Sequence, residues 1–260
     1  MGKIVSIHSF RGGTGKSNLT ANVAARVAMA GKRVAIVDTD IQSPGIHVLF
    51  GLDDRTMVHS LNQYLHDELP IADVAFDIGA AAANDALPGR RQLAGRSLWL
   101  VPSSINGAEI ARVLKEGYDV MRLNRGMMSL LKDLKLDYLF LDTHPGLNQE
   151  TMLSVAISDV LIIILRPDQQ DFQGTAVTVD VARSLDVPDM MLVVNKLLEK
   201  YPPEETRAYV EQTYGVSVAA VLPLSEDMAD LGSADLFSLC HPEHKWSRGI
   251  QQVADKLLAL

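Results

Sequence analysis

The chain has 260 residues, which is enough to bury one complete hydrophobic core. Its formal net charge of -8 at pH 7 argues against a protein that coats nucleic acid by bulk charge, although a local basic patch stays compatible with it. The single cysteine, Cys240, excludes an intrachain disulfide framework and any Cys-x-x-Cys pair within one subunit.

Short β-rich runs alternate with helical stretches along the chain. A parallel sheet covered by helices on both faces has this pattern, and several runs are apolar throughout, as strands buried on both sides are. A helix is predicted over residues 19–30, with Gly31 just past its end, and the chain closes with an amphipathic helix around residues 250–258. The predicted strands are residues 3–9, 33–38, 97–102, 138–142, 160–165, 190–195 and 218–222.

These elements predict one doubly wound α/β domain over residues 1–260. We expect a mostly parallel central sheet of about seven strands, flanked by helices. The sequence contains no internal repeat, low-complexity tract or linker. The alanine-rich stretch 77–96, which includes Pro88 and Gly89, is predicted to be the one long loop.

A glycine-rich segment lies between the first predicted strand and the first predicted helix. Residues 12–17 read Gly-Gly-Thr-Gly-Lys-Ser. Glycines let consecutive backbone N–H groups point at one anion, Lys16 reaches the β- and γ-phosphates, and the Ser17 hydroxyl ligates Mg²⁺. The strict motif G-x-x-x-x-G-K-[ST] fails, because its first glycine position holds Phe10. The strand–loop–helix context still favours a phosphate-binding loop over a glycine-rich turn that binds nothing.

Three aspartates follow predicted strands. Asp38 ends the second strand, Asp40 follows it closely, and Asp142 ends the strand 138–142. Carboxyl ends of parallel strands meet at one edge of the sheet, beside the phosphate loop. A lone aspartate at such a place is often a helix N-cap. Three together predict carboxylates near Mg²⁺ and near the attacking water of a phosphoryl transfer.

With these residues the chain resembles the deviant-Walker ATPases that include ParA and MinD. The loop of that family reads roughly K-G-G-x-G-K-[TS], followed by D-x-D and then by D-x-P-P/G. Residues 11–17, 38–40 and 142–146 stand in those places, in the same order. The resemblance continues through residues 193–196 and 222–224 to the closing helix, so it covers essentially the whole chain.

The resemblance implies ATP and Mg²⁺ as ligands, and it implies roles for single residues. Lys16 would pair with the β- and γ-phosphate oxygens, and Asp40 would position the hydrolytic water. Segments 40–47 and 142–148 resemble switches I and II, which sense the γ-phosphate. The implied metal site consists of Ser17 as a direct ligand, with Asp38 and Asp142 holding Mg²⁺ through waters. The implied nucleotide contacts are Gly12, Gly13, Thr14, Gly15, Lys16, Ser17, Asn18, Asn195 (on the adenine edge), Lys196, and Pro223 and Leu224 (closing the base pocket).

Two residues depart from the family pattern. Arg11 stands where the family has a signature lysine that reaches the partner's nucleotide across an ATP-sandwiched dimer. A guanidinium keeps the charge and binds phosphate, so we expect Arg11 to serve as that lysine does; slower hydrolysis or a monomer-only site are the alternatives. His144 stands where switch II commonly has proline. We expect a solvated loop histidine there, with a pH-sensitive switch contact as the alternative.

The implied function is an ATPase that acts as a molecular switch. It would form a homodimer on binding ATP, position or partition DNA or another large cargo, and reset by slow hydrolysis stimulated by a partner. A nucleotide-gated scaffold or a delivery chaperone with little turnover is the alternative, because Arg11 is not lysine. An unidentified cargo adaptor or ATPase activator is the implied partner.

The sequence also bears on binding to DNA or to a membrane and on where in the cell the protein is found. Non-specific DNA is a candidate partner through local basic residues, against the alternative of ordinary solvated charge. Membrane binding is not expected, because the stripe of the closing helix suits the sheet better than lipid. Residues 1–7 lack the apolar stretch of a secretory signal, and the apolar run 160–165 is far shorter than the ~20 residues of a spanning helix, so we expect a cytoplasmic protein. The candidate DNA contacts are Arg122, Arg125, Lys132 and Lys135, or Arg90, Arg91 and Arg96.

Overall fold

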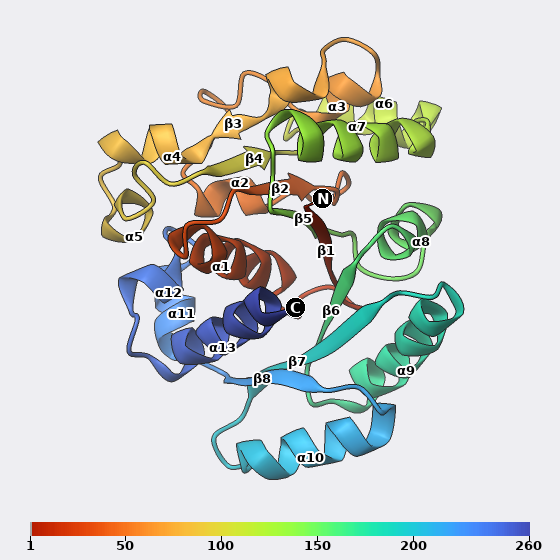
Figure 1. Ribbon diagram of the computed structural model, residues 1–260, viewed down its shortest axis with the longest axis vertical. Coiled ribbons are helices and arrows are strands. Elements are labelled where there is room, and N and C mark those ends of the chain that lie inside the picture. Colours follow the sequence, from red (N-terminus) through yellow and green to blue (C-terminus); the bar gives the residue numbers. More distant parts are fainter. Residues whose placement is uncertain (1) are drawn as a thin grey trace.

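The computed structural model describes residues 2–260, and it places eight strands of this range in one sheet with helices on both faces (Figure 1). The strand order is β3-β4-β2-β5-β1-β6-β7-β8; the pairs are parallel except for β3–β4, which is antiparallel. The predicted α/β class with a mostly parallel sheet is confirmed. The strands are β1 Lys3–His8, β2 Val34–Asp38, β3 Phe76–Asp77, β4 Leu98–Val101, β5 Tyr138–Asp142, β6 Val160–Leu165, β7 Asp189–Leu197 and β8 Val218–Pro223.

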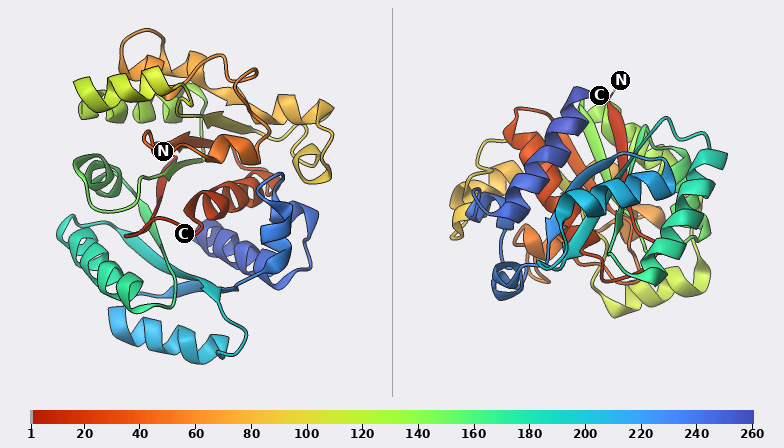
Figure 2. Two further views of the ribbon diagram at one scale, coloured as in Figure 1. Left: turned by 180° about the vertical axis from the view of Figure 1, so that it is seen from behind. Right: turned by 90° about the horizontal axis from the view of Figure 1, so that it is seen from below.

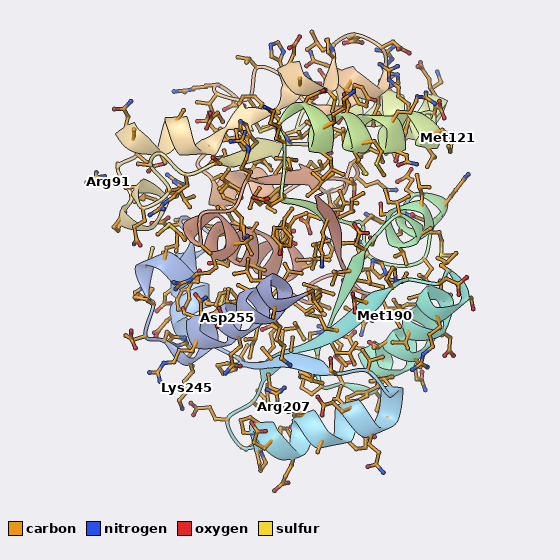
Figure 3. The ribbon with its side chains drawn as sticks, in the orientation of Figure 1. Arg91, Met121, Met190, Arg207, Lys245 and Asp255 are labelled. Carbon is orange, nitrogen blue, oxygen red and sulfur yellow. The ribbon has the colours of Figure 1, made fainter. Side chains whose placement is uncertain are left out.

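Helices cover the two faces because successive side chains of each strand point in opposite directions. On the central strand β1, Val5 and Ile7 pack in one apolar cluster with residues of α1 and α13, whereas Ile4 packs in a second cluster with residues of α7. The two further views show this layered arrangement (Figure 2), and side chains fill the space between the layers (Figure 3). The helices are α1 Lys16–Met29, α2 Ile46–Leu49, α3 Leu61–Leu65, η1 Ile71–Val74, α4 Ile78–Ala81, η2 Ala82–Asn84, α5 Pro88–Arg91, α6 Gly107–Glu116, α7 Val120–Asp133, α8 Gln149–Ala156, α9 Gln169–Ser184, α10 Pro203–Tyr214, α11 Glu226–Leu231, α12 Phe237–Cys240 and α13 Lys245–Ala259.

Two details of the sequence prediction are corrected. The expected count of about seven strands is one short, because the edge strand β3 has only two residues and therefore no readable pattern. The stretch 77–96, predicted to be a long loop, contains the short helices α4, η2 and α5. Asp77 caps α4 by accepting a hydrogen bond from the Ala80 N–H at 2.8 Å. Asp235 accepts from the N–H groups of Gly89 and Arg90, which fixes the first turn of α5 to a distant part of the chain.

The sheet topology places the carboxyl ends of β1, β2 and β5 side by side. β5 lies between β1 and β2, and the register pairs Asp38 directly with Asp142. The segment after β1 is therefore next to both aspartates. None of the helices within residues 2–260 has the length and apolar composition that crossing a membrane requires.

Candidate active site

The glycine-rich loop connects β1 to α1, and its glycines have backbone conformations that other residues rarely adopt. Gly13 has φ +76° and Gly15 has φ +94°. A Cβ on Gly15 would also lie 2.6 Å from the Asn195 amide nitrogen. The loop borders a cavity of about 260 Å³, a size suited to phosphate groups rather than to a whole drug-sized ligand. Its lining consists of Ser9, Gly12, Gly13, Thr14, Gly15, Lys16, Ser17, Asn18, Asp40, Ser43 and Pro145.

A buried ion pair lies below this loop. Lys16 Nζ is 2.9 Å from Asp142 Oδ1, and both side chains are almost fully buried. The Thr20 hydroxyl lies 3.2 Å from the same carboxylate oxygen. A buried ammonium needs such a partner, so the ion pair fixes the position of Lys16 beside the loop. The structure thus brings Lys16 and Asp142 together as the sequence predicted.

Asp38 is the second buried carboxylate at this place. Its Oδ1 accepts a hydrogen bond from the Asp40 N–H at 3.0 Å. Burial, followed by the negative charge of Asp142, raises the pKa of Asp38 well above its usual value, while Lys16 opposes the rise. The raised pKa means that the ionised form of Asp38 has too little positive charge around it in this structure, and a bound cation would supply that charge.

Unpartnered oxygen atoms also indicate a cation site near Asp38 and Asp142. Within residues 2–260, Asp38 Oδ2, Asp142 Oδ2 and Thr14 Oγ1 are buried and have no hydrogen-bond partner. The described chain holds no group of three or more His, Cys, Asp or Glu side chains arranged to hold a metal. The unpartnered oxygens of Asp38 and Asp142 can accept hydrogen bonds from the waters of a hydrated Mg²⁺. Ser17 lines the cavity at the start of α1, and its role as the hydroxyl ligand stays a prediction.

Asp40 connects the two predicted switch segments. Its Oδ1 accepts hydrogen bonds from the Ser43 N–H at 3.1 Å and from the Ser43 hydroxyl at 3.0 Å. The same oxygen lies 2.7 Å from His144 Nδ1, which must carry the proton because a carboxylate only accepts. The expectation of a solvated loop histidine is therefore wrong: His144 is half-buried and holds the carboxylate that lines the cavity.

Arg11 points to acidic residues of its own chain. Its guanidinium lies 3.8 Å from Asp168 and 3.7 Å from Asp171, at the start of α9. Arg166 pairs with the same two carboxylates, at 3.4 and 2.9 Å. This acidic pair was not predicted from the sequence, although Asp168 follows a predicted strand and caps α9 by accepting a hydrogen bond from the Asp171 N–H.

Two residues at the end of β7 donate hydrogen bonds to the backbone of the glycine-rich loop. The Asn195 amide donates to the Thr14 carbonyl at 2.8 Å, and its oxygen lies 3.4 Å from the indole N–H of Trp246, a residue that the sequence analysis missed. Lys196 Nζ donates to the Gly13 carbonyl at 2.7 Å. Both functions of the Asn195 amide are thus engaged, and its contact with adenine stays a prediction. Pro223 and Leu224 lie beside Leu197 at the ends of neighbouring strands.

The arginines considered for DNA binding are mostly engaged within the protein. Arg122 pairs with Asp67 and stacks over Tyr64, Arg125 lies 2.9 Å from Asp119, and Arg90 lies 2.7 Å from Asp85.

Cys240 contacts Asp235 at 3.0 Å, and burial together with this carboxylate raises the pKa of the thiol to about 12, so the thiol is unreactive.

Comparisons with known proteins agree with this geometry. Residues 2–186 match the AAA_31 family, described as an AAA domain. The septum site-determining protein MinD of Thermotoga maritima is 23% identical over 240 residues, which cover 88% of this chain and 78% of that protein.

Solved structures share the fold. The septum site-determining protein MinD of Pyrococcus horikoshii, complexed with Mg-ADP, has a TM-score of 0.80 at 20% identity and covers 100% of this chain and 98% of its own. A plasmid partition protein of Borrelia burgdorferi has a TM-score of 0.70 at 17% identity, with 99% and 98% covered. The matched domain, the loop and the aspartates around it show that the chain belongs to the ParA/MinD family of P-loop ATPases.

Proposed function

We propose that residues 1–260 act as one cytoplasmic ATPase domain that switches between ATP-bound and ADP-bound states. The observation that carries the proposal is the buried set of Lys16, Asp38 and Asp142 under the glycine-rich loop. These charges are costly to bury, and a Mg²⁺-bound polyphosphate is the ligand that would satisfy their remaining oxygens and the lysine together.

The residues of the site divide the task. Backbone N–H groups of residues 12–17 surround phosphate oxygens, and Lys16 Nζ turns from Asp142 toward the β- and γ-phosphates. Mg²⁺, when bound, would neutralise phosphate charge, with Ser17 as its direct ligand and Asp38 and Asp142 on its waters. Asp40 orients the attacking water, while Ser43 and His144 hold its carboxylate in place.

Arg11 ties the proposed dimer to the nucleotide state. Its carboxylate partners are half-exposed or shared with Arg166, so the pairs cost little to break. We propose that Arg11 leaves Asp168 and Asp171 when ATP is bound and contacts the nucleotide of the second subunit. The second candidate, a nucleotide-gated scaffold with little turnover, is favoured by the same pairs, because they hold Arg11 away from the cavity in the single chain.

The proposed cellular task is positioning or partitioning of a large cargo through an adaptor or activator. Its support is the naming of relatives as a septum site-determining protein and a plasmid partition protein. Direct DNA binding is the weaker form of this proposal, because three of the five candidate arginines, Arg90, Arg122 and Arg125, already have acidic partners.

Steady-state phosphate release tests the proposal. We expect slow, Mg²⁺-dependent release that disappears in Lys16→Ala, together with loss of nucleotide binding. Asp40→Ala is expected to keep ATP binding and lose release by about 100-fold or more, the usual contribution of a group that handles the reacting proton or water. Unchanged turnover in Asp40→Ala would remove the assignment of Asp40, and ATP binding without turnover in the native protein would favour the scaffold.

A further inference from the structure

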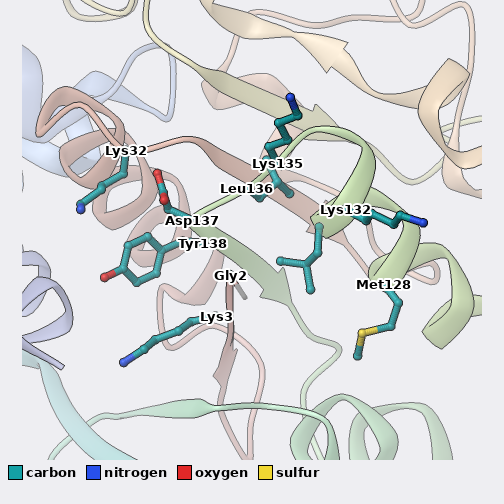
Figure 4. A pocket seen from close by; sticks show the side chains of 10 residues that line it. Gly2, Lys3, Lys32, Met128, Lys132, Lys135, Leu136, Asp137 and Tyr138 are labelled. Carbon is teal, nitrogen blue, oxygen red and sulfur yellow. The ribbon is translucent and has the colours of Figure 1, made fainter.

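A second and larger cavity lies at the opposite edge of the sheet, where the strands begin. Its volume is about 890 Å³, within the range of ~300–1,000 Å³ that is typical of small-molecule sites (Figure 4). It is formed by the starts of β1 and β5, the turn after α1, and the end of α7. The lining residues are Gly2, Lys3, Lys32, Met128, Leu131, Lys132, Lys135, Leu136, Asp137 and Tyr138.

The floor of this cavity is apolar. Leu131, Leu136 and Tyr138 belong to the buried core and show the cavity only their outer atoms, while Met128 is 37% exposed. Gly2, just before β1, fits closely against this floor, since a Cβ on it would lie 2.1 Å from the Leu136 carbonyl oxygen. An apolar surface of this kind gains free energy when a ligand removes it from water.

Four lysines surround the floor. Figure 4 shows Lys3 and Lys32 on the same side of the cavity as Tyr138. Lys132 extends on the opposite side, and Lys135 follows it at the end of α7. None of the four has a carboxylate of residues 2–260 within 4.0 Å.

The charge balance of the cavity is opposite to that of the chain. One acidic residue, Asp137, lines it, and its carboxylate already accepts a hydrogen bond from the Arg33 N–H at 2.8 Å. The formal net charge of the whole chain is -8. Lysines gathered without partners around an apolar floor in such a chain match a negatively charged ligand.

We propose that this cavity binds a small organic anion that has an apolar body and carboxylate, sulfonate or phosphate groups. The apolar body would cover Leu131, Leu136 and Met128, and the acidic groups would reach the lysines at its sides. A bilayer surface is less suited, because the floor is recessed between the lysines. A nucleic-acid backbone is also less suited, because its phosphates would leave the apolar floor uncovered.

The test uses the anionic dye 8-anilinonaphthalene-1-sulfonate and its uncharged counterpart N-phenyl-1-naphthylamine. Full-length protein carries ¹³C-methyl methionine and saturating ADP–Mg²⁺, which keeps the dye out of the phosphate loop, and Met128→Leu assigns the Met128 signal. We expect a saturable shift of the Met128 methyl with the sulfonate, and weaker binding of the uncharged compound.

Charge-reversal variants test whether the lysines contribute to the affinity for the anionic dye. In Lys132→Glu/Lys135→Glu we expect the dye affinity to fall at least about tenfold. The matched variant Lys200→Glu/Lys245→Glu changes the net charge equally at exposed lysines that do not line the cavity and should stay within about twofold of the native protein. Because all four side chains are exposed, folding should survive, and an unchanged midpoint of urea denaturation checks it.

Three outcomes would overturn the proposal. One is a Met128 methyl that does not move, and another is an equal loss of affinity in both double variants. The third is preferential binding of phosphatidylglycerol vesicles or of poly-glutamate with the same lysine dependence, which would assign the cavity to a membrane or an acidic peptide. None of these results bears on ATP hydrolysis, so this proposal and the proposed function fail separately.

Discussion

The two edges of the central sheet use charge in opposite ways. At the carboxyl edge Lys16 is 7% exposed and bonded to Asp142, and Asp40 is held by Ser43 and His144. At the amino edge Lys132 is exposed and has no carboxylate partner within residues 2–260. Buried charges must be paired to be tolerated, so their geometry is set before a ligand binds. Exposed lysines stay hydrated and need no ion-pair partner, so their side chains can reorient when a ligand binds.

The largest expected effect tests this difference directly. Lys16→Met leaves Asp142 buried without its ammonium partner, and breaking such a pair typically costs about 3–5 kcal/mol of unfolding free energy. The matched change Lys132→Met at the amino edge should stay within about 0.5 kcal/mol. Urea denaturation of both variants measures the two losses. Equal losses would mean that the buried, paired Lys16 contributes no more to stability than the exposed, unpaired Lys132.

The pH dependence of stability gives the next effect. His8, the last residue of β1, is fully buried, and burial, followed by the charges of Lys16 and His144, lowers its pKa from 6.5 to about 3. Its Nδ1 lies 2.9 Å from the Thr143 hydroxyl, which itself donates to the Ile7 carbonyl, so Nδ1 must be the donor. The folded protein therefore holds His8 neutral with the proton on Nδ1.

Between pH 6.5 and about 3 the unfolded chain binds a proton at His8 that the folded chain does not. The stability contribution of His8 is therefore complete above pH 6.5 and falls by about 1.4 kcal/mol per pH unit as the pH decreases. In His8→Asn, whose amide replaces the Nδ1 donor, we expect a shallower slope in this window. Urea denaturation at a series of pH values measures it; parallel slopes would contradict the neutral His8.

A smaller effect concerns the contact between the switches. His144→Gln is expected to lower the rate of phosphate release by about tenfold while ATP affinity stays unchanged, because His144 positions Asp40 and does not line the phosphate cavity. Single-turnover hydrolysis and nucleotide titration separate the two quantities. His144→Asn, whose amide nitrogen is equivalent to Nδ1, should recover part of the rate. A loss of ATP affinity without a change in rate would contradict this role.

The smallest effect on stability is expected at Arg11. Its side chain is 41% exposed, and ion pairs of this kind contribute about 0–1 kcal/mol to stability, so the Arg11→Ala protein should unfold at nearly the native urea concentration.

The role of Arg11 in the proposed dimer is tested by the mass in solution of Asp40→Ala protein with ATP–Mg²⁺. We expect a dimer that is absent with ADP and absent when Arg11→Ala is added. A monomer under every condition would favour the nucleotide-gated scaffold.

The parts of the molecule that were predictable from sequence are those with a local signal. The apolar runs located β1, β2 and β4–β8. The glycine-rich loop was predicted to be a phosphate site because its residue types and their spacing coincide within a few positions, and the structure places a cavity beside it. Asp38 and Asp142 were predicted to be neighbours because parallel strands end at one edge, and the register pairs them.

The missed features depend on contacts between distant parts of the chain. His144 meets Asp40 only because two strand ends converge, and Trp246 reaches Asn195 from the last helix. The helix α5 has a weak local pattern and is held by Asp235. The lysines of the second cavity come from three separate segments, namely β1, the turn after α1 and the end of α7, so no spacing along the sequence could indicate that all four share one site.

The position of β1 has a consequence for how the protein can move. This strand is hydrogen-bonded along its length to β5 on one side and to β6 on the other, and the glycine-rich loop starts where it ends. Sliding β1 would break two ladders at once, so the loop is anchored to the stiffest part of the molecule. Asp40 and His144, in contrast, lie on segments that follow β2 and β5 outside the sheet, and one hydrogen bond joins their side chains. The Gly146 N–H also donates to the Ser9 carbonyl at the start of the loop. Work done by nucleotide turnover should therefore appear as displacement of these two segments about a stationary loop.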